Sequence, residues 1–203
     1  MSIAEKLQTI VDNEQRVFDA GKKSEYDRFW DNYQEYGNRT FYFGAFSGWG
    51  WADETFAPKY PIICKASGSV TYMFGQSNIT DIYVPIIVDY SVGSLTTMFI
   101  NASKLKTIRE LNIVETLRFS NTFDNCHTLE NITITGIIGQ NGLNFQWSTK
   151  LSKASIENII SCLSTTTSGL TVTLSKTAVD AAFTETEWET LIATKPNWTI
   201  SLV

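Results

Sequence analysis

The stretch of sequence that decides the fold is FDNCHTLENI, residues 123–132, because its apolar and small residues recur along the chain at nearly fixed offsets. Phenylalanine recurs at spacings of 25, 24 and 22 residues, with a small residue three positions later and an aliphatic residue shortly after that. The aligned residues are Phe74, Phe99, Phe123 and Phe145; Ser77, Ala102, Cys126 and Ser148; and Ile79, Leu105, Leu129 and Leu151. Repeats of this length predict units that bury their apolar residues only by stacking on their neighbours.

Each residue of the repeat has a physical interpretation. Leu129, Ile132 and Ile134 lead into a short strand that faces inward, and the phenylalanine inserts between neighbouring units. The small residue lies where the chain turns tightly, so Cys126 is expected to be a buried packing residue rather than a nucleophile. Residues 69–152 are therefore predicted to form a leucine-rich-repeat-like solenoid of three to four stacked rungs.

The part of the chain before the repeats divides into two segments. Residues 2–20 and 24–36 place apolar side chains at helical spacing, which predicts an N-terminal helical attachment or oligomerisation segment over residues 1–37. Residues 38–68 combine many aromatic residues with glycines, which predicts a collar of closely packed backbone and rings.

The residues after the repeats show the pattern of alternating helices and strands. Apolar residues indicate helices over 155–163 and 184–194, and alternation indicates strands over 170–174 and 198–203. Residues 153–203 are expected to form a helix-strand-helix-strand cap on the open end of the solenoid. The predicted class is therefore α+β: N-terminal helices, a short solenoid and an α/β C-terminal cap.

The repeat resembles that of the BspA-like leucine-rich repeat proteins. FDNCHTLENI and the Met-Phe pairs at 73–74 and 98–99 carry this resemblance. The stretches EYDRFWDNYQ (25–34), GNRT (37–40) and WADETFAPKY (51–60) look like the leader of such proteins in phages and prophages of Gram-positive bacteria, and NWT (197–199) is similar to their usual end. The resemblance implies a virion structural protein exposed on a tail or head appendage, and it transfers no functional residue.

Composition narrows the classes of partner. Asp and Glu outnumber Lys and Arg by 21 to 16, and the sequence pI of about 4.9 argues against nucleic acid as a partner. No apolar run reaches the ~20 residues of a spanning helix, so no membrane insertion is expected. The N-terminus lacks the pattern of a signal peptide. We expect synthesis in the cytoplasm of a bacterial host and a final location in the virion.

The inventory of reactive residues predicts that the protein is not an enzyme and needs no cofactor or metal. His127 is the only histidine and directly follows Cys126, so a Cys–His catalytic pair is disfavoured. No phosphate-binding loop, dinucleotide fingerprint or serine-hydrolase motif occurs. A glycan-cleaving enzyme would need paired carboxylates such as Glu185, Glu187 and Glu189, which are expected on a solvated helix.

Aromatic residues of the collar are the candidate ligand-binding site. Tyr42, Phe46, Trp49 and Trp51 offer rings that stack on sugars, and Asp53 offers a carboxylate for hydroxyl groups. The alternative is that these rings only pack against the first rung.

The leading prediction for function is a non-enzymatic phage virion protein that presents its repeat surface for particle assembly or host-surface contact. The expected partners are other virion proteins, further copies of the chain (a trimer is favoured) and a host surface glycan or protein. The alternative function is a bacterial adhesin-like module that binds glycans or proteins.

Overall fold

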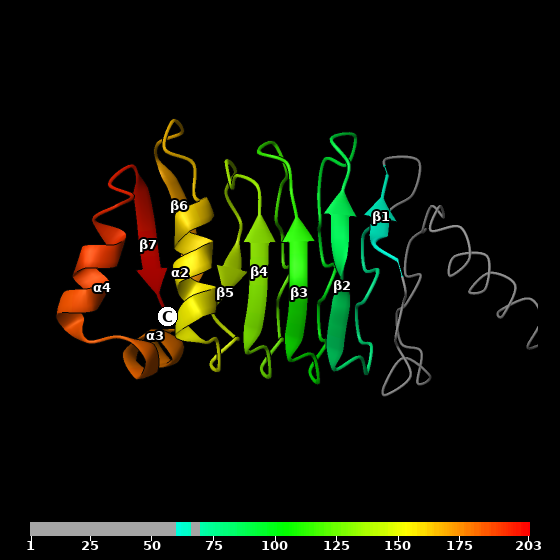
Figure 1. Cartoon of the computed structure of the whole chain (residues 1–203), viewed down its shortest axis with the longest axis horizontal. Helices are drawn as coiled ribbons and strands as arrows, with labels where there is room; N and C mark the ends of the chain where they lie inside the picture. The colour runs from blue at the N-terminus through cyan, green and yellow to red at the C-terminus, as the bar shows by residue number, and fades with distance from the viewer. Residues whose placement is uncertain (1–59, 66–69) are drawn as a thin grey trace, which may run out of the picture. The chain divides into compact units, whose positions relative to one another are not determined.

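Parallel strands in two sheets, together with three helices, make up the part of the chain that the structure describes (Figure 1). This computed structural model describes residues 60–65 and 70–203, all in the second of the chain's two units, Thr40–Val203. The first sheet contains, in order, β1 (Ile62–Cys64), β2 (Asp81–Val88), β3 (Thr107–Asn112) and β4 (Asn131–Thr135). The second contains β5 (Asn144–Phe145), β6 (Leu170–Leu174) and β7 (Trp198–Leu202). The helices are α2 (Lys153–Cys162), α3 (Lys176–Ala182) and α4 (Glu185–Ile192).

This arrangement shows that the predicted fold class is wrong. The sequence predicts an α+β fold with a solenoid of three to four rungs, whereas the described residues form an α/β arrangement with a four-stranded and a three-stranded parallel sheet. Parallel neighbours need a crossover, and helices supply it in the C-terminal part: α2 lies between β5 and β6 in the chain, and α3 and α4 lie between β6 and β7. The helices therefore connect strands of the second sheet instead of forming a separate cap.

The aliphatic residues of the first sheet are aligned from strand to strand. Ile82 lies opposite Ile108, and Ile108 lies opposite Ile132. All three are fully or almost fully buried, and the residues that follow them face outward. A slip of one residue would expose the whole row to water, so burial of one face fixes the register.

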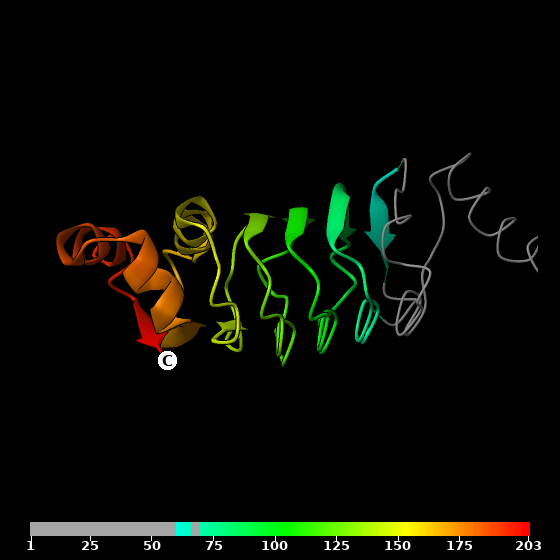
Figure 2. The same cartoon turned by 90° about the horizontal axis from the view of Figure 1, so that it is seen from below.

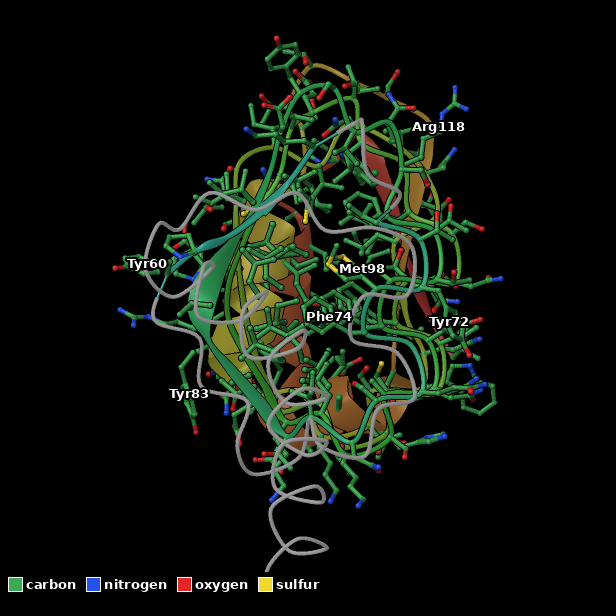
Figure 3. All side chains as sticks on the ribbon, turned by 90° about the vertical axis from the view of Figure 1, so that its right-hand side faces the viewer. Tyr60, Tyr72, Phe74, Tyr83, Met98 and Arg118 are labelled. Atoms are coloured by element: carbon green, nitrogen blue, oxygen red, sulfur yellow. The ribbon has the colours of Figure 1, made fainter. Side chains whose placement is uncertain are left out.

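The four phenylalanines that the sequence aligns form a continuous buried stack. Ring centroids are 5.2 Å apart for Phe74 and Phe99, 5.3 Å for Phe99 and Phe123, and 4.5 Å for Phe123 and Phe145. None of these rings is exposed to solvent. Figure 3 shows Phe74 in the interior, between the sheet and the turns on the opposite side. The predicted equivalence of these four positions is confirmed.

The turns that carry the first three phenylalanines share an unusual backbone. The residues two before and two after each ring have positive φ, from 52° to 60°. Backbone hydrogen bonds link successive turns, for example from Phe74 N to the Met98 carbonyl (2.8 Å) and from Asn101 N to the Asp124 carbonyl (2.8 Å). The turn side of the molecule is therefore as regular as the sheet side. The residues with positive φ are Tyr72, Gln76, Thr97, Asn101, Asn121 and Asn125.

The C-terminal elements agree with the sequence except for one helix. The strand over 170–174 has the predicted bounds, and α2, α4 and β7 begin or end within two residues of the predicted ones. Helix α3 was not predicted, because Ala178 and Val179 are its only buried residues and its seven residues are too few to show a helical period. Among the described residues, no helix combines the length and the apolar character needed to cross a bilayer.

Helix α2 closes the edge of the first sheet at β4. The Asn158 side chain accepts a hydrogen bond from Ile134 N (2.7 Å) and donates one to the Ile134 carbonyl (3.1 Å). Ser155 Oγ accepts from Ile132 N (3.0 Å) and donates to the Glu130 carbonyl (3.3 Å). In Figure 2, α2 continues the layer of β1–β4, and the second sheet lies in the opposite layer. Two polar side chains thus take the place of a fifth strand and satisfy the exposed backbone groups.

Replacing Asn158 with leucine should lower the free energy of unfolding by about 1–3 kcal/mol, because the Ile134 N–H and carbonyl would lose their partners at a part-buried edge. Chemical denaturation of the full chain, followed by circular dichroism, measures the change. The matched control is Glu157→Leu, which alters an exposed residue of the same helix. Equal stability of the two variants would show that the sheet edge does not depend on the amide.

Three side chains of the sequence KPNW, residues 195–198, hold the segment that follows α2. Lys195 is buried, and its ammonium group donates to the carbonyls of Ser161 and Leu163. Asn197 Nδ2 donates to the carbonyls of Ser164 and Thr167, and Trp198 Nε1 donates to that of Ser164 (2.9 Å). The ammonium charge lies at the C-terminal end of α2, where the helix dipole favours a cation. These bonds give NWT a structural role.

Candidate functional site

The residues predicted to bind a ligand lie outside the described part of the chain. Tyr42, Phe46, Trp49, Trp51 and Asp53 all precede residue 60, where the described residues begin. The collar and the N-terminal segment are likewise outside it, apart from residues 60–65 of the collar. Both the collar site and its alternative, packing alone, therefore stay predictions.

The cysteines that the structure describes are not arranged for catalysis. Cys64 and Cys126 are fully buried, and burial raises the pKa of each thiol to about 12. Cys126 Sγ lies 3.1 Å from the Phe99 carbonyl in the core, whereas the neighbouring His127 is exposed. The predicted burial of Cys126 is confirmed. Burial also raises the pKa of the half-buried Cys162.

Of the three carboxylates of α4, Glu187 has a clear structural role. Glu187 accepts hydrogen bonds from Lys153 Nζ (2.7 Å) and from Thr184 N (2.8 Å), the second of which closes the N-terminus of α4. These bonds, Lys153 first, lower the pKa of Glu187 to about 2. Such a carboxyl is a poor general acid at neutral pH. Within residues 60–65 and 70–203, no three His, Cys, Asp or Glu side chains are grouped to hold a metal ion.

The outer face of the first sheet carries exposed side chains from β2, β3 and β4. Tyr83, Arg109 and Thr133 directly follow the aligned isoleucines of β2, β3 and β4 and are exposed on the opposite face, at the points where the register shifts; we call them the Tyr83 row. Tyr83 is 60% exposed, and Arg109 and Thr133 are exposed. Figure 3 shows Tyr83 on the outer side of the sheet, away from Phe74 and Met98 in the interior.

Local contacts hold the Tyr83 row in place. Arg109 Nη1 donates to the Tyr83 carbonyl across the strand pair (3.2 Å). The negative charge of Asp81, which precedes Tyr83 by two residues, raises the pKa of the Tyr83 hydroxyl, with smaller contributions from desolvation and from a hydrogen bond to Asp81. The phenol therefore stays protonated at neutral pH and remains a hydrogen-bond donor.

A second row on this face is more sheltered. Ile63, Ile87, Asn112 and Thr135 lie next to one another in the register of the four strands and are half-buried. Thr135 Oγ1 donates to Glu110 Oε1 (3.0 Å), which joins β4 to β3 at the surface. The face as a whole is a mixed surface of aliphatic, aromatic, charged and hydroxyl side chains on a sheet whose other face is buried. It suits contact with another macromolecule better than enclosure of a small molecule.

The prediction of ligand-binding residues from sequence missed Tyr83 and Arg109. Both occupy outward positions of short strands, where a single polar or aromatic residue carries no periodic signal. The alternation in DIYVPIIV, residues 81–88, does place Tyr83 on the face opposite Ile82, so that signal could have found it.

Comparisons of this chain with protein-family models, with curated proteins and with solved structures gave no match.

Proposed function

We propose that the protein is a non-enzymatic structural protein of a phage virion, which uses the outer face of its first sheet for particle assembly or for contact with the host surface. The observation that supports this most directly is the Tyr83 row: exposed Tyr83 and Arg109 lie side by side on a sheet whose other face is fully packed. Tyrosine and arginine are enriched among residues that dominate interface energies.

The rigidity of this surface supports the same proposal. The isoleucines behind the row and the stacked phenylalanines beyond them are buried, so the exposed side chains stand on a well-packed support. A surface that is already ordered loses less conformational entropy when a partner binds. The resemblance of the repeat and leader to those of phage proteins supplies the virion context. Attachment or trimerisation through residues 1–37 stays a prediction from the sequence.

The first test locates the protein. Mass spectrometry of purified virions is expected to detect the chain, and antibody-labelled particle imaging is expected to place it on a tail or head appendage. Absence from the particles would contradict the proposal. Its presence on the bacterial surface instead would favour the alternative, an adhesin-like module.

The second test addresses the surface. Particles that carry Tyr83→Ala with Arg109→Ala should incorporate the protein or adsorb to host cells at least about tenfold less well, since the loss of one hot-spot residue typically costs more than 1 kcal/mol. The control is Tyr90→Ala, because Tyr90 is 84% exposed and lies beyond the end of β2. Normal incorporation and adsorption of the double variant would exclude the Tyr83 row as the contact surface.

A further inference from the structure

A second surface, on the turn side of the molecule, is built from uncharged hydrogen-bonding side chains that end at an exposed tryptophan. The residues two positions after each stacked phenylalanine are Gln76, Asn101, Asn125 and Trp147. We call Gln76, Asn101 and Asn125 the amide row, and Trp147 is the corresponding residue of the fourth unit. Two residues further on, Ser103 and His127 form part of a parallel row. The charged neighbours Asp124, Lys104 and Lys150 lie one residue outside these rows and carry both signs.

A hydrogen bond between Asn101 and Asn125 orders two members of the amide row before any ligand binds. Asn125 Nδ2 donates to Asn101 Oδ1 (2.7 Å), which joins successive units at the surface. Both asparagines have positive φ, 58° and 59°, and the backbone N–H of Asn101 bonds to the Asp124 carbonyl beneath them. Within the described residues, the remaining donor Asn101 Nδ2 and the remaining acceptor Asn125 Oδ1 have no hydrogen-bond partner, so both can bond to a ligand.

Trp147 differs from the other tryptophans that the structure describes. Trp198 is 7% exposed, and its indole N–H donates to the Ser164 carbonyl. Trp188, on α4, packs beside Phe183, which precedes that helix. Trp147 is 41% exposed, and no partner for its indole N–H occurs among residues 60–65 and 70–203. Its one ring contact is with His127, edge-on, at 5.5 Å between centroids. An apolar ring with a free N–H thus lies against His127, in the row beside the amide row.

From this juxtaposition we infer that the amide row and Trp147 bind an uncharged, extended glycan. A pyranose has an apolar C–H face that stacks on an indole ring and hydroxyl groups that both donate to and accept from amides. The rows lack carboxylates and ammonium groups, which favours a neutral polymer over an acidic one. The successive units are about as far apart as their stacked rings, 4.5–5.3 Å, which is close to the advance of one pyranose along an extended chain. The inference deepens the proposed host contact and rests on that function for its biological role.

The test uses the full chain and a panel of neutral linear hexasaccharides of glucose, galactose, mannose and N-acetylglucosamine, with hexagalacturonate as the acidic probe. Isothermal titration calorimetry should detect binding of at least one neutral hexamer and weaker or no binding of hexagalacturonate. Trp147→Ala should raise the Kd of that hexamer at least about tenfold, and Asn125→Leu should raise it as well. Tyr90→Ala is the control and should leave the Kd unchanged, because Tyr90 is an aromatic residue on a different segment and is more exposed than Trp147, 84% against 41%.

Failure here can be told apart from failure of the proposed function. If no neutral hexamer binds, if hexagalacturonate binds better, or if Trp147→Ala binds as the unmodified chain does, the glycan inference is overturned. The virion location and the effect of the Tyr83 and Arg109 substitutions would be untouched by any of these results. Thermal melting of Trp147→Ala within about 2 °C of the unmodified chain would show that lost binding is not lost folding.

Discussion

Replacing Phe99 with alanine is expected to lower the free energy of unfolding by about 3–5 kcal/mol, the usual cost of truncating a buried phenylalanine. Phe99 is completely buried and stacks on Phe74 on one side and on Phe123 on the other, at 5.2 and 5.3 Å. Its loss removes two stacking contacts and leaves a cavity between turns whose backbones are hydrogen-bonded to each other, so the walls cannot easily collapse.

Thermal and chemical denaturation of the full chain measure the effect. For a protein of this size the loss corresponds to a drop in Tm of roughly 6–20 °C. Phe99→Leu should fall between the unmodified chain and Phe99→Ala, because leucine fills part of the cavity. Tyr90→Ala, which truncates an exposed aromatic residue, should change stability by less than about 0.5 kcal/mol. If Phe99→Ala matched Tyr90→Ala, the phenylalanine stack would not be a stabilising core.

The alignment of the phenylalanines was predictable because a small residue occurs three positions after each of them in the sequence. The structure shows why that residue must be small: Cys126 and Ser148 are buried, and each places its sulfur or hydroxyl against a core carbonyl of the preceding unit, Phe99 O and Cys126 O. A larger side chain would not fit there. A spacing set by packing in this way survives changes of sequence elsewhere in the repeat.

The fold class was not predictable from the same repeat. Similar units give no signal of which strands pair. Phe145 continues the phenylalanine stack, but the fourth unit is followed by α2 instead of a strand of the first sheet, and its β5 pairs with β6. Where the earlier units have Ile82, Ile108 and Ile132, this unit has Ala154 in α2. The weaker match marks the point at which a helix replaces a strand, and Ser155 and Asn158 then bond to β4 in place of a strand backbone.

The candidate binding residues were harder to predict than the core. Burial imposes a period on apolar residues, but the exposed positions beside them are free to vary. Trp147 has no periodic partner in the sequence, and only the structure shows that it is 41% exposed and lies against His127. The sequence directed attention to the aromatic residues of the collar, because they are concentrated there, and the described surfaces carry their aromatic residues singly.

The two candidate surfaces lie on opposite sides of one buried core, and their chemistry differs. The Tyr83 row combines an aromatic ring with a guanidinium group, which suits a protein partner, whereas the amide row is uncharged and hydrogen-bonding. The proposed function calls for contact with the particle or with the host. The sheet side and the turn side are both regular, so each can provide a separate contact surface.

Gly142→Ala is expected to destabilise the protein by about 3–5 kcal/mol although Gly142 is exposed. Its φ is +98°, a value that costs an L-residue about 1–2 kcal/mol, and a Cβ at this position would overlap the carbonyl oxygen of Phe119. Relieving that overlap with a backbone atom would push apart two neighbouring turns, at a further cost of about 2–3 kcal/mol. Chemical denaturation of the full chain measures the total.

Two other glycines separate backbone strain from steric overlap. Gly169 also has positive φ (+73°), but nothing lies near its missing Cβ, so Gly169→Ala should cost only the strain, about 1–2 kcal/mol. Gly93 lacks positive φ and has open space around it, so Gly93→Ala should be neutral or stabilise by about 0.4–1 kcal/mol through the unfolded state. The expected order of stability is therefore Gly93→Ala, then Gly169→Ala, then Gly142→Ala. If Gly142→Ala were as stable as Gly169→Ala, the turn after β4 would not pack against Phe119 as closely as the structure shows, because that contact is present at Gly142 and absent at Gly169.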